Sequence, residues 1–204
     1  MSFADNYFKR YKSQPKIFSD NPCSNTGIIV VIPCFNDPFI LKTLDSLESA
    51  KSIDCNIEVI LIVNSGENTD KSIVEENRRT FELLQELARK NHFTKFKLLP
   101  TLIEGTSRKI AGVGFARKTG MDEAIRRFDI IDNKDGIICS LDADTLVSKD
   151  YFIEIQRFYT QNKKAGACIF QFQHNFDKEI FSTDEIEACK LYEIYLRYFR
   201  LALE

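Results

Sequence analysis

The sequence has no apolar run approaching the roughly 20 residues that a membrane-spanning helix needs. Its first residues also lack the basic and then apolar build of a signal peptide. The formal net charge is only −2, with both signs interspersed, so there is no polybasic patch for nucleic acid or a membrane surface. We therefore expect no transmembrane segment and no nucleic-acid partner.

Closely spaced cysteines are absent as well. None of the six has a neighbour at the spacing of a zinc knuckle or a redox motif: Cys23, Cys34, Cys55, Cys139, Cys168 and Cys189. Cys139 and Cys168 stand inside apolar runs, where cysteine behaves as a small hydrophobic residue. This usage predicts a reducing, cytoplasmic compartment.

The rest of the composition is that of an ordinary globular domain, with 204 residues, 44% of them hydrophobic and 28% charged. Residues 1–26 are polar and contain Pro15 and Pro22, so we expect an irregular lead-in. A single domain is expected over residues 27–204. Leu203-Glu204 has the form of a cloning remnant, and we expect the natural protein to continue beyond it.

Strand and helix patterns alternate along this domain. Continuous β-branched or apolar runs predict buried strands at 27–33, 57–63, 95–99, 136–141 and 166–172. Apolar residues at helical spacing predict helices at 40–47, 71–90, 114–128, 151–159 and 183–203. Such alternation indicates an α/β three-layer sandwich with a mainly parallel central sheet, a Rossmann-like architecture.

Ligands of such sheets bind outside the carboxyl ends of the strands. Four polar loops should meet at that edge: 34–37, 64–70, 104–114 and 142–145. In the last loop, Asp142 and Asp144 follow an apolar strand and should project to the same side. Two hard oxygen ligands suit Mg²⁺ or Mn²⁺ together with substrate phosphates. A solvated turn that caps the helix near Asp150 is the alternative.

The third loop leads into Gly112-Val113-Gly114-Phe115-Ala116-Arg117-Lys118-Thr119-Gly120. Both the dinucleotide fingerprint and the Walker phosphate loop require glycine where Arg117 stands. The segment is therefore read as the start of a helix, whose N–H groups could bind a diphosphate together with Arg117 and Lys118. Ordinary solvated helix charges are the alternative.

The first two loops carry side chains that could recognise a nucleoside through hydrogen bonds or stacking. Asn36, Asp37, Asn64 and Ser65 have the donors and acceptors for a base edge and ribose hydroxyls, although each could equally cap a helix or form a turn. Phe35 could stack on a base or serve as an apolar plug.

Taken in order, four blocks resemble the donor half of a family-two glycosyltransferase, a nucleotide-diphospho-sugar transferase of the A-type fold. They are Pro33-Cys34-Phe35-Asn36-Asp37, Asn64-Ser65-Gly66, the 114–120 segment and Leu141-Asp142-Ala143-Asp144. The match runs from residue 27 to about residue 172. It departs from the family where two aspartates often precede Gly66, and at Lys118, where the family often has asparagine.

The resemblance implies a role for each block. Pro33, the rest of the first loop, and Asn64 or Ser65 would hold the nucleoside, and Arg117 would lie near the base or diphosphate. Asp142 would contact the ribose side, and Asp144 would reach the Mn²⁺ or Mg²⁺ ion. The implied enzyme is an inverting, hexosyltransferase-like protein with a UDP-sugar as the first candidate donor. Its acceptor, whether glycan, lipid or small molecule, is open.

In inverting members a carboxylate well beyond the metal motif takes the acceptor's proton, so we expect the catalytic base beyond residue 204. The predicted last helix carries Tyr192, Tyr195, Tyr198, Phe199 and Leu201, a surface that could form a homodimer. A sugar-1-phosphate nucleotidyltransferase would need a glycine-rich, basic loop after the first strand, which residues 34–37 are not. A non-catalytic nucleotide-binding fragment is the remaining alternative.

Overall fold

The computed structural model describes residues 2–11, 13–174, 176 and 181–203. Glu204, one of the two residues of the expected cloning remnant, lies outside them. The chain divides into two compact units, Met1–Thr160 and Gln161–Glu204, and each is described by itself.

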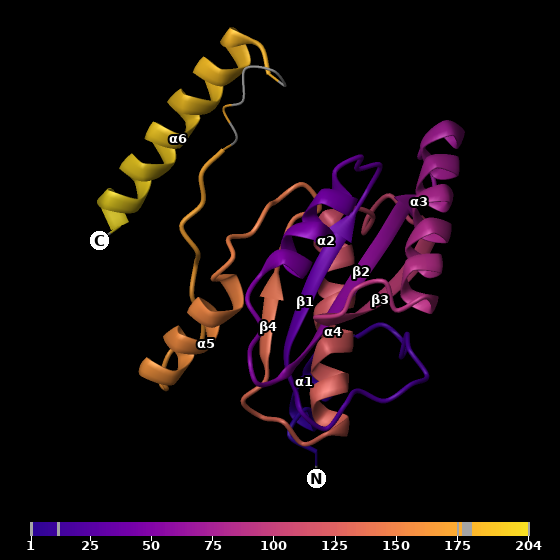
Figure 1. The fold of residues 1–204 in the computed structure, drawn as a ribbon. Helices are drawn as coiled ribbons and strands as arrows, with labels where there is room; N and C mark the ends of the chain where they lie inside the picture. The colour runs from indigo at the N-terminus through magenta and orange to yellow at the C-terminus, as the bar shows by residue number, and fades with distance from the viewer. Residues whose placement is uncertain (1, 12, 175, 177–180, 204) are drawn as a thin grey trace. The chain divides into compact units, whose positions relative to one another are not determined.

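The first unit is built on four parallel strands, β1 (Thr26–Cys34), β2 (Asn56–Gly66), β3 (Phe96–Thr106) and β4 (Ile137–Ser140). Their order is β3-β2-β1-β4 (Figure 1). In this register Val30 of β1 lies beside Val59 of β2 on one side and Cys139 of β4 on the other. The strand order reverses between β1 and β4, which is the switch point where open α/β sheets bind ligands.

Helices cover both faces of the sheet. Val30 and Ile32 face a core with α2 (Ile40–Ser49), α3 (Lys71–Arg89) and α5 (Tyr151–Gln161). Their neighbours Ile29 and Val31 point to the opposite face, where Ala116, Ala124 and Phe128 of α4 (Val113–Ile130) pack. Both faces of the two central strands, β1 and β2, are therefore buried, which explains their continuous apolar runs. The predicted three-layer sandwich with a parallel sheet is confirmed.

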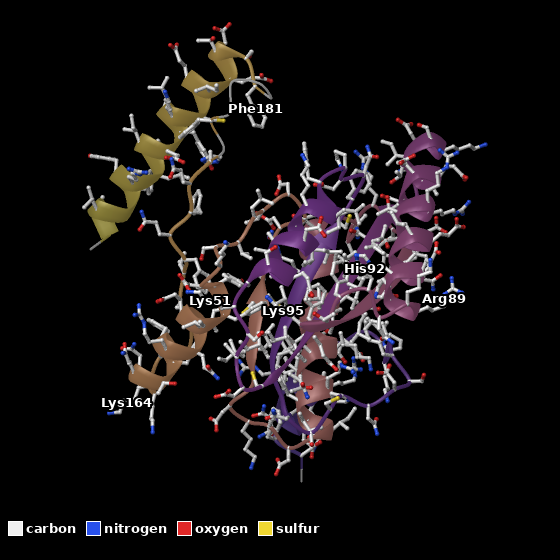
Figure 2. The ribbon with its side chains drawn as sticks, viewed as in Figure 1. Lys51, Arg89, His92, Lys95, Lys164 and Phe181 are labelled. Atoms are coloured by element: carbon white, nitrogen blue, oxygen red, sulfur yellow. The ribbon has the colours of Figure 1, made fainter. Side chains whose placement is uncertain are left out.

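The two largest flanking helices differ in their fit to the sheet. The outer side of α3 is charged and exposed, and Arg89 at its end points away from the sheet (Figure 2). The helix α4 packs closely against β1, because Gly120 approaches the side chain of Val31 so nearly that a Cβ atom would overlap it. This close approach fixes the position of α4 over β1.

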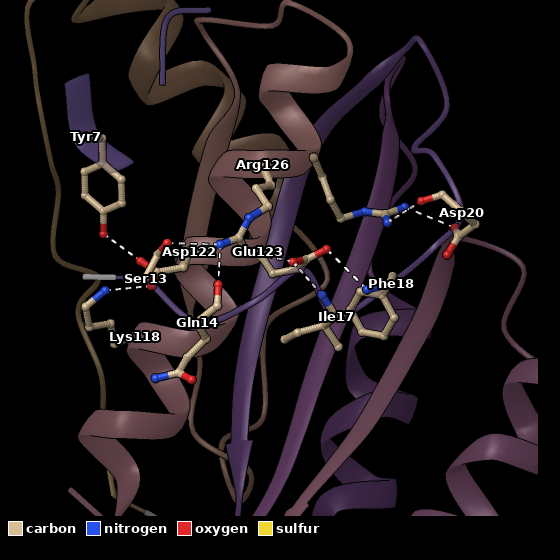
Figure 3. Close-up of polar contacts among 11 residues, drawn as sticks. Tyr7, Ser13, Gln14, Ile17, Phe18, Asp20, Lys118, Asp122, Glu123 and Arg126 are labelled. Atoms are coloured by element: carbon tan, nitrogen blue, oxygen red, sulfur yellow. Dashed lines mark hydrogen bonds and ion pairs between the residues drawn. The ribbon is translucent and has the colours of Figure 1, made fainter. Parts of the chain in front are cut away.

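The N-terminal lead-in is bound to α4 by polar contacts (Figure 3). Glu123, fully buried, accepts the backbone N–H groups of Ile17 and Phe18 at 3.1 and 3.5 Å. Arg126 donates to Ser13 Oγ at 3.2 Å and to the carbonyl of Gln14.

The lead-in, which we expected to be irregular, also contains a short helix, α1 (Asp5–Arg10). Its Tyr7 hydroxyl donates to Asp122 Oδ1 at 2.7 Å, and Asp122 is fully buried on α4. Composition alone did not indicate α1, because its attachment depends on α4, more than 100 residues away.

The second unit contains α6 (Thr183–Leu203). The strand expected at residues 166–172 is wrong, since this segment forms no regular secondary structure and pairs with no strand of the described residues. Its apolar side chains are not buried either, with Ile169 95% exposed and Phe172 57% exposed. His174 Nδ1 lies 3.0 Å from Glu193 Oε1 of α6. None of the helices in the described residues combines the length and the apolar composition of a membrane span.

Candidate functional site

A cavity of about 740 Å³ opens at the carboxyl ends of the strands. All four predicted loop segments contribute to its wall, and the predicted site residues among its lining are Pro33, Phe35, Asp37, Asn64, Arg117, Asp142 and Asp144. Asn36 and Ser65 are not in the lining. The sheet therefore brings together side chains that are more than 100 positions apart in the sequence, at the switch point between β1 and β4.

The first loop turns sharply after Cys34. Asn36 has φ +47°, in the left-handed region, which asparagine tolerates better than most residues. Phe35 is half exposed in the cavity wall. Asp37 Oδ1 accepts the N–H of Phe39 at 2.7 Å, at the entry to α2. Burial and then the nearby charge of Asp144 raise the pKa of Asp37 above its usual range.

Asn64 and Ser65 lie on a strand and not in a turn, because β2 continues to Gly66. Both are buried, 3% and 1% exposed. Alternate side chains of a strand point to opposite sides, so Asn64 reaches the cavity while Ser65 does not. The hydroxyl of Ser65 is buried with no hydrogen-bond partner in the described part of the chain.

Arg117, in the second turn of α4, forms an ion pair with Asp142 Oδ1. The start of this helix has no side-chain cap, and its Gly112 and Val113 line the cavity. Uncapped N–H groups and the helix dipole favour an anion at this position. Arg117 Nε is buried without a partner among the described residues, so this guanidinium has remaining capacity to donate.

Lys118 is directed elsewhere. Its ammonium group binds Asp122 Oδ2 at 2.6 Å and lies 5.9 Å from the centre of the Tyr7 ring. It is not part of the cavity lining. The second cation in the lining is Arg108, whose backbone N–H donates to Glu67 Oε1 at 3.0 Å.

The carboxylates of the last loop differ in their surroundings. Asp142 is paired with Arg117, whereas the exposed carboxylate of Asp144 has no hydrogen-bond or ion-pair partner in the part of the chain described. No group of three or more His, Cys, Asp or Glu side chains able to hold a metal occurs within those residues. One or two carboxylates in a cavity wall fit Mg²⁺ or Mn²⁺ that is also bound by substrate phosphates.

Two buried polar residues support these loops and were missed by the sequence analysis. Thr43 of α2 is fully buried, and its Oγ1 donates to the carbonyl of Ala143 at 2.6 Å. Asn77 of α3 is 1% exposed and binds both the first loop and β2. The sequence does contain a signal for Thr43 and Asn77, since each is a polar residue at a position that faces inward on an amphipathic helix.

The sequence matches no protein-family model and no curated protein. Among solved structures, the chain is similar to the crystal structure of S. aureus TarS 1-349, with 16% identity and a TM-score of 0.46. That alignment covers 72% of this chain and 39% of the other. The TarS 1-349 complexes with UDP-GlcNAc and with UDP align over the same 72% of this chain and 37% and 38% of theirs. Their identities are 15% and 14%, with TM-scores of 0.46.

Proposed function

We propose that this chain binds a nucleotide-diphosphate sugar and is the donor-binding part of a glycosyltransferase of the family-two kind. The observation that carries the proposal is the cavity at the switch point, which unites an aromatic and amide wall with an uncapped helix start, Arg117 and the carboxylates of Asp142 and Asp144. These groups match the successive parts of the donor, which are the base, the ribose, the diphosphate and its metal. UDP is the first candidate nucleotide.

The chemical role of each wall follows from its groups. Phe35 offers a ring face to a base, and Asn64 offers an amide that can hydrogen-bond to its edge. Arg117 and the N-terminus of α4 would bind the diphosphate through charge-assisted hydrogen bonds. They would also stabilise the charge left on the nucleotide when its bond to the sugar carbon breaks.

Asp144, with Asp142 beside it, would hold the Mn²⁺ or Mg²⁺ ion. Asp144 is the stronger candidate because no cation among the described residues pairs with it, whereas Asp142 already binds Arg117. Such an ion supplies charge neutralisation at the diphosphate. Arg117 pairs with Oδ1 of Asp142, and in the described part of the chain Oδ2 has no side-chain partner, so it would be the atom that contacts the ribose side of the donor.

The test is calorimetric titration of the chain with UDP, GDP and dTDP, each with and without Mn²⁺. We expect one of these nucleotides to bind more tightly when the metal is present. A complete lack of binding by all three would contradict the proposal. Binding is measured in place of turnover because the catalytic base is expected beyond residue 204. The base, the inverting outcome and the hexose preference all stay predictions.

Three further expectations also stay predictions. The acceptor is a glycan, lipid or small molecule. The cytoplasmic location rests on cysteine usage alone. A homodimer through α6 is suggested by exposed side chains such as Leu191, Tyr198 and Leu201, which are 68%, 69% and 72% exposed.

A further inference from the structure

A buried asparagine links two walls of the cavity. Asn77 lies on the inward face of α3, and its Oδ1 accepts the backbone N–H of Asn36 at 2.8 Å. Its Nδ2 donates to the backbone carbonyl of Asn64 at 3.4 Å. These partners are 41 and 13 residues away in the sequence, at the ends of β1 and β2.

The hydrogen bonds continue to a third wall. Asn64 Nδ2 donates to the carbonyl of Gly112, at the start of α4, over 3.5 Å. We call Asn36, Asn77, Asn64 and Gly112, joined in this order, the amide chain. It connects three of the four segments that line the cavity, and two of its three links depend on the side-chain amide of Asn77.

The link to Asn36 acts on a strained backbone. Asn36 holds φ +47°, a conformation that asparagine tolerates better than most residues but that is still less populated than the common regions, so a fixed hydrogen bond is needed to keep it occupied. Its neighbours on either side, Phe35 and Asp37, both line the cavity. The hydrogen bond from Asn36 to Asn77 therefore determines how an aromatic ring and a carboxylate are presented to a ligand.

Core packing alone does not account for this residue. A buried amide is desolvated on folding, and only its hydrogen bonds offset that penalty. An apolar side chain of similar size, such as leucine, would fill the same space without this desolvation penalty. Both hydrogen bonds of Asn77 go to backbone groups of cavity segments and neither goes to its own helix.

We infer that Asn77 is a positioning residue that preorganises the nucleoside end of the cavity through the amide chain. This inference rests on the proposed function, because it assigns the preorganised surface to a nucleotide. Asn77 touches no ligand itself. It removes in advance part of the ordering penalty that Phe35, Asn36 and Asp37 would otherwise incur when the nucleotide binds.

The test compares Asn77→Leu with Leu84→Ala. Leu84 is fully buried on the same face of α3, two helical turns further along, so its replacement destabilises the same helix without touching the cavity. Affinity for UDP with Mn²⁺ is measured by calorimetry at a temperature where all variants are folded. We expect about tenfold weaker binding for Asn77→Leu and unchanged binding for Leu84→Ala. Equal affinities of wild type and Asn77→Leu would overturn the inference.

A rescue variant separates positioning from general damage. Glycine adopts φ +47° without strain, so adding Asn36→Gly to Asn77→Leu should recover part of the lost affinity. A double variant that binds no better than Asn77→Leu would contradict the role assigned to the left-handed turn.

A readout without nucleotide keeps this inference distinct from the proposed function. Amide exchange of the Asn36 N–H, followed by NMR, should be slow in wild type and in Leu84→Ala and fast in Asn77→Leu. Slow exchange in Asn77→Leu would overturn the positioning role. If wild type binds no nucleotide, the proposed function fails, and exchange alone decides whether Asn77 holds the loop.

Discussion

Arg117 of α4 and Asp142 beyond β4 form an ion pair within the lining of the cavity. The two side chains are 36% and 56% exposed, so the pair is partly solvated and adds little to the stability of the fold. The ion pair matters for ligand binding because it holds the Arg117 guanidinium near the uncapped start of α4 and the carboxylates of the last loop.

Replacing Arg117 by alanine should weaken binding of UDP more than binding of uridine, by about tenfold or more for the diphosphate. The reason is that the guanidinium would bind phosphate oxygens, which uridine lacks. Titration calorimetry with both ligands measures the difference. Lys118→Ala is the matched control, because it removes the same charge from the adjacent position of α4 but binds Asp122 outside the cavity. Equal losses for UDP and uridine would remove the assigned role of Arg117.

Gly120→Ala should destabilise the first unit. The added methyl group would overlap the side chain of Val31 on β1, and such overpacking costs about 1–3 kcal/mol, more than the roughly 1 kcal/mol gained in helix propensity. Urea unfolding measures the change. Gly114→Ala on the same helix is the control, since its methyl group meets no atom within 4 Å. An equal response of both variants would argue against the close packing of α4.

The attachment of α1 predicts a dependence on alkaline pH. Burial, followed by the hydrogen bond and charge of Asp122, raises the pKa of Tyr7 to about 12. A folded-state pKa above the unfolded value of about 10 means that this contribution is complete below pH 10 and is lost as pH rises toward 12.

Tyr7→Phe should therefore be less stable than wild type at pH 8, by about 1 kcal/mol for the lost hydrogen bond. The difference in the free energy of unfolding between the two proteins should shrink as the pH is raised from 10 to 12. Comparing the variants cancels the titration of the lysines. A difference that stays constant over this interval would show that Tyr7 does not titrate as the contact with Asp122 requires.

The centre of the sheet was predictable because β1 and β2 are buried on both faces. Runs such as 27–33 and 57–63 are continuously apolar, and this pattern has few other structural solutions. The apolar run at 166–172 has the same local pattern but found no strand partner in the described residues. Strand pairing is a tertiary interaction, so a single apolar run does not establish it.

The edge of the sheet at which the cavity lies was also predictable, because the carboxyl ends of parallel strands meet at one edge. The direction of individual side chains was not. Ser65 and Lys118 carry suitable groups for a ligand, but strand alternation turns the first away and Asp122 holds the second. The supporting residues Thr43 and Asn77 were also hidden, because their partners are backbone groups far away in the sequence.

The most direct test of the central claim is titration of wild type and Asp144→Asn with UDP in the presence and absence of Mn²⁺. Asparagine keeps the size of the side chain and removes the one carboxylate of the last loop that no cation in the described residues compensates. We predict that Mn²⁺ strengthens UDP binding by wild type about tenfold or more and has almost no effect on Asp144→Asn. The same metal enhancement in both proteins would contradict the account.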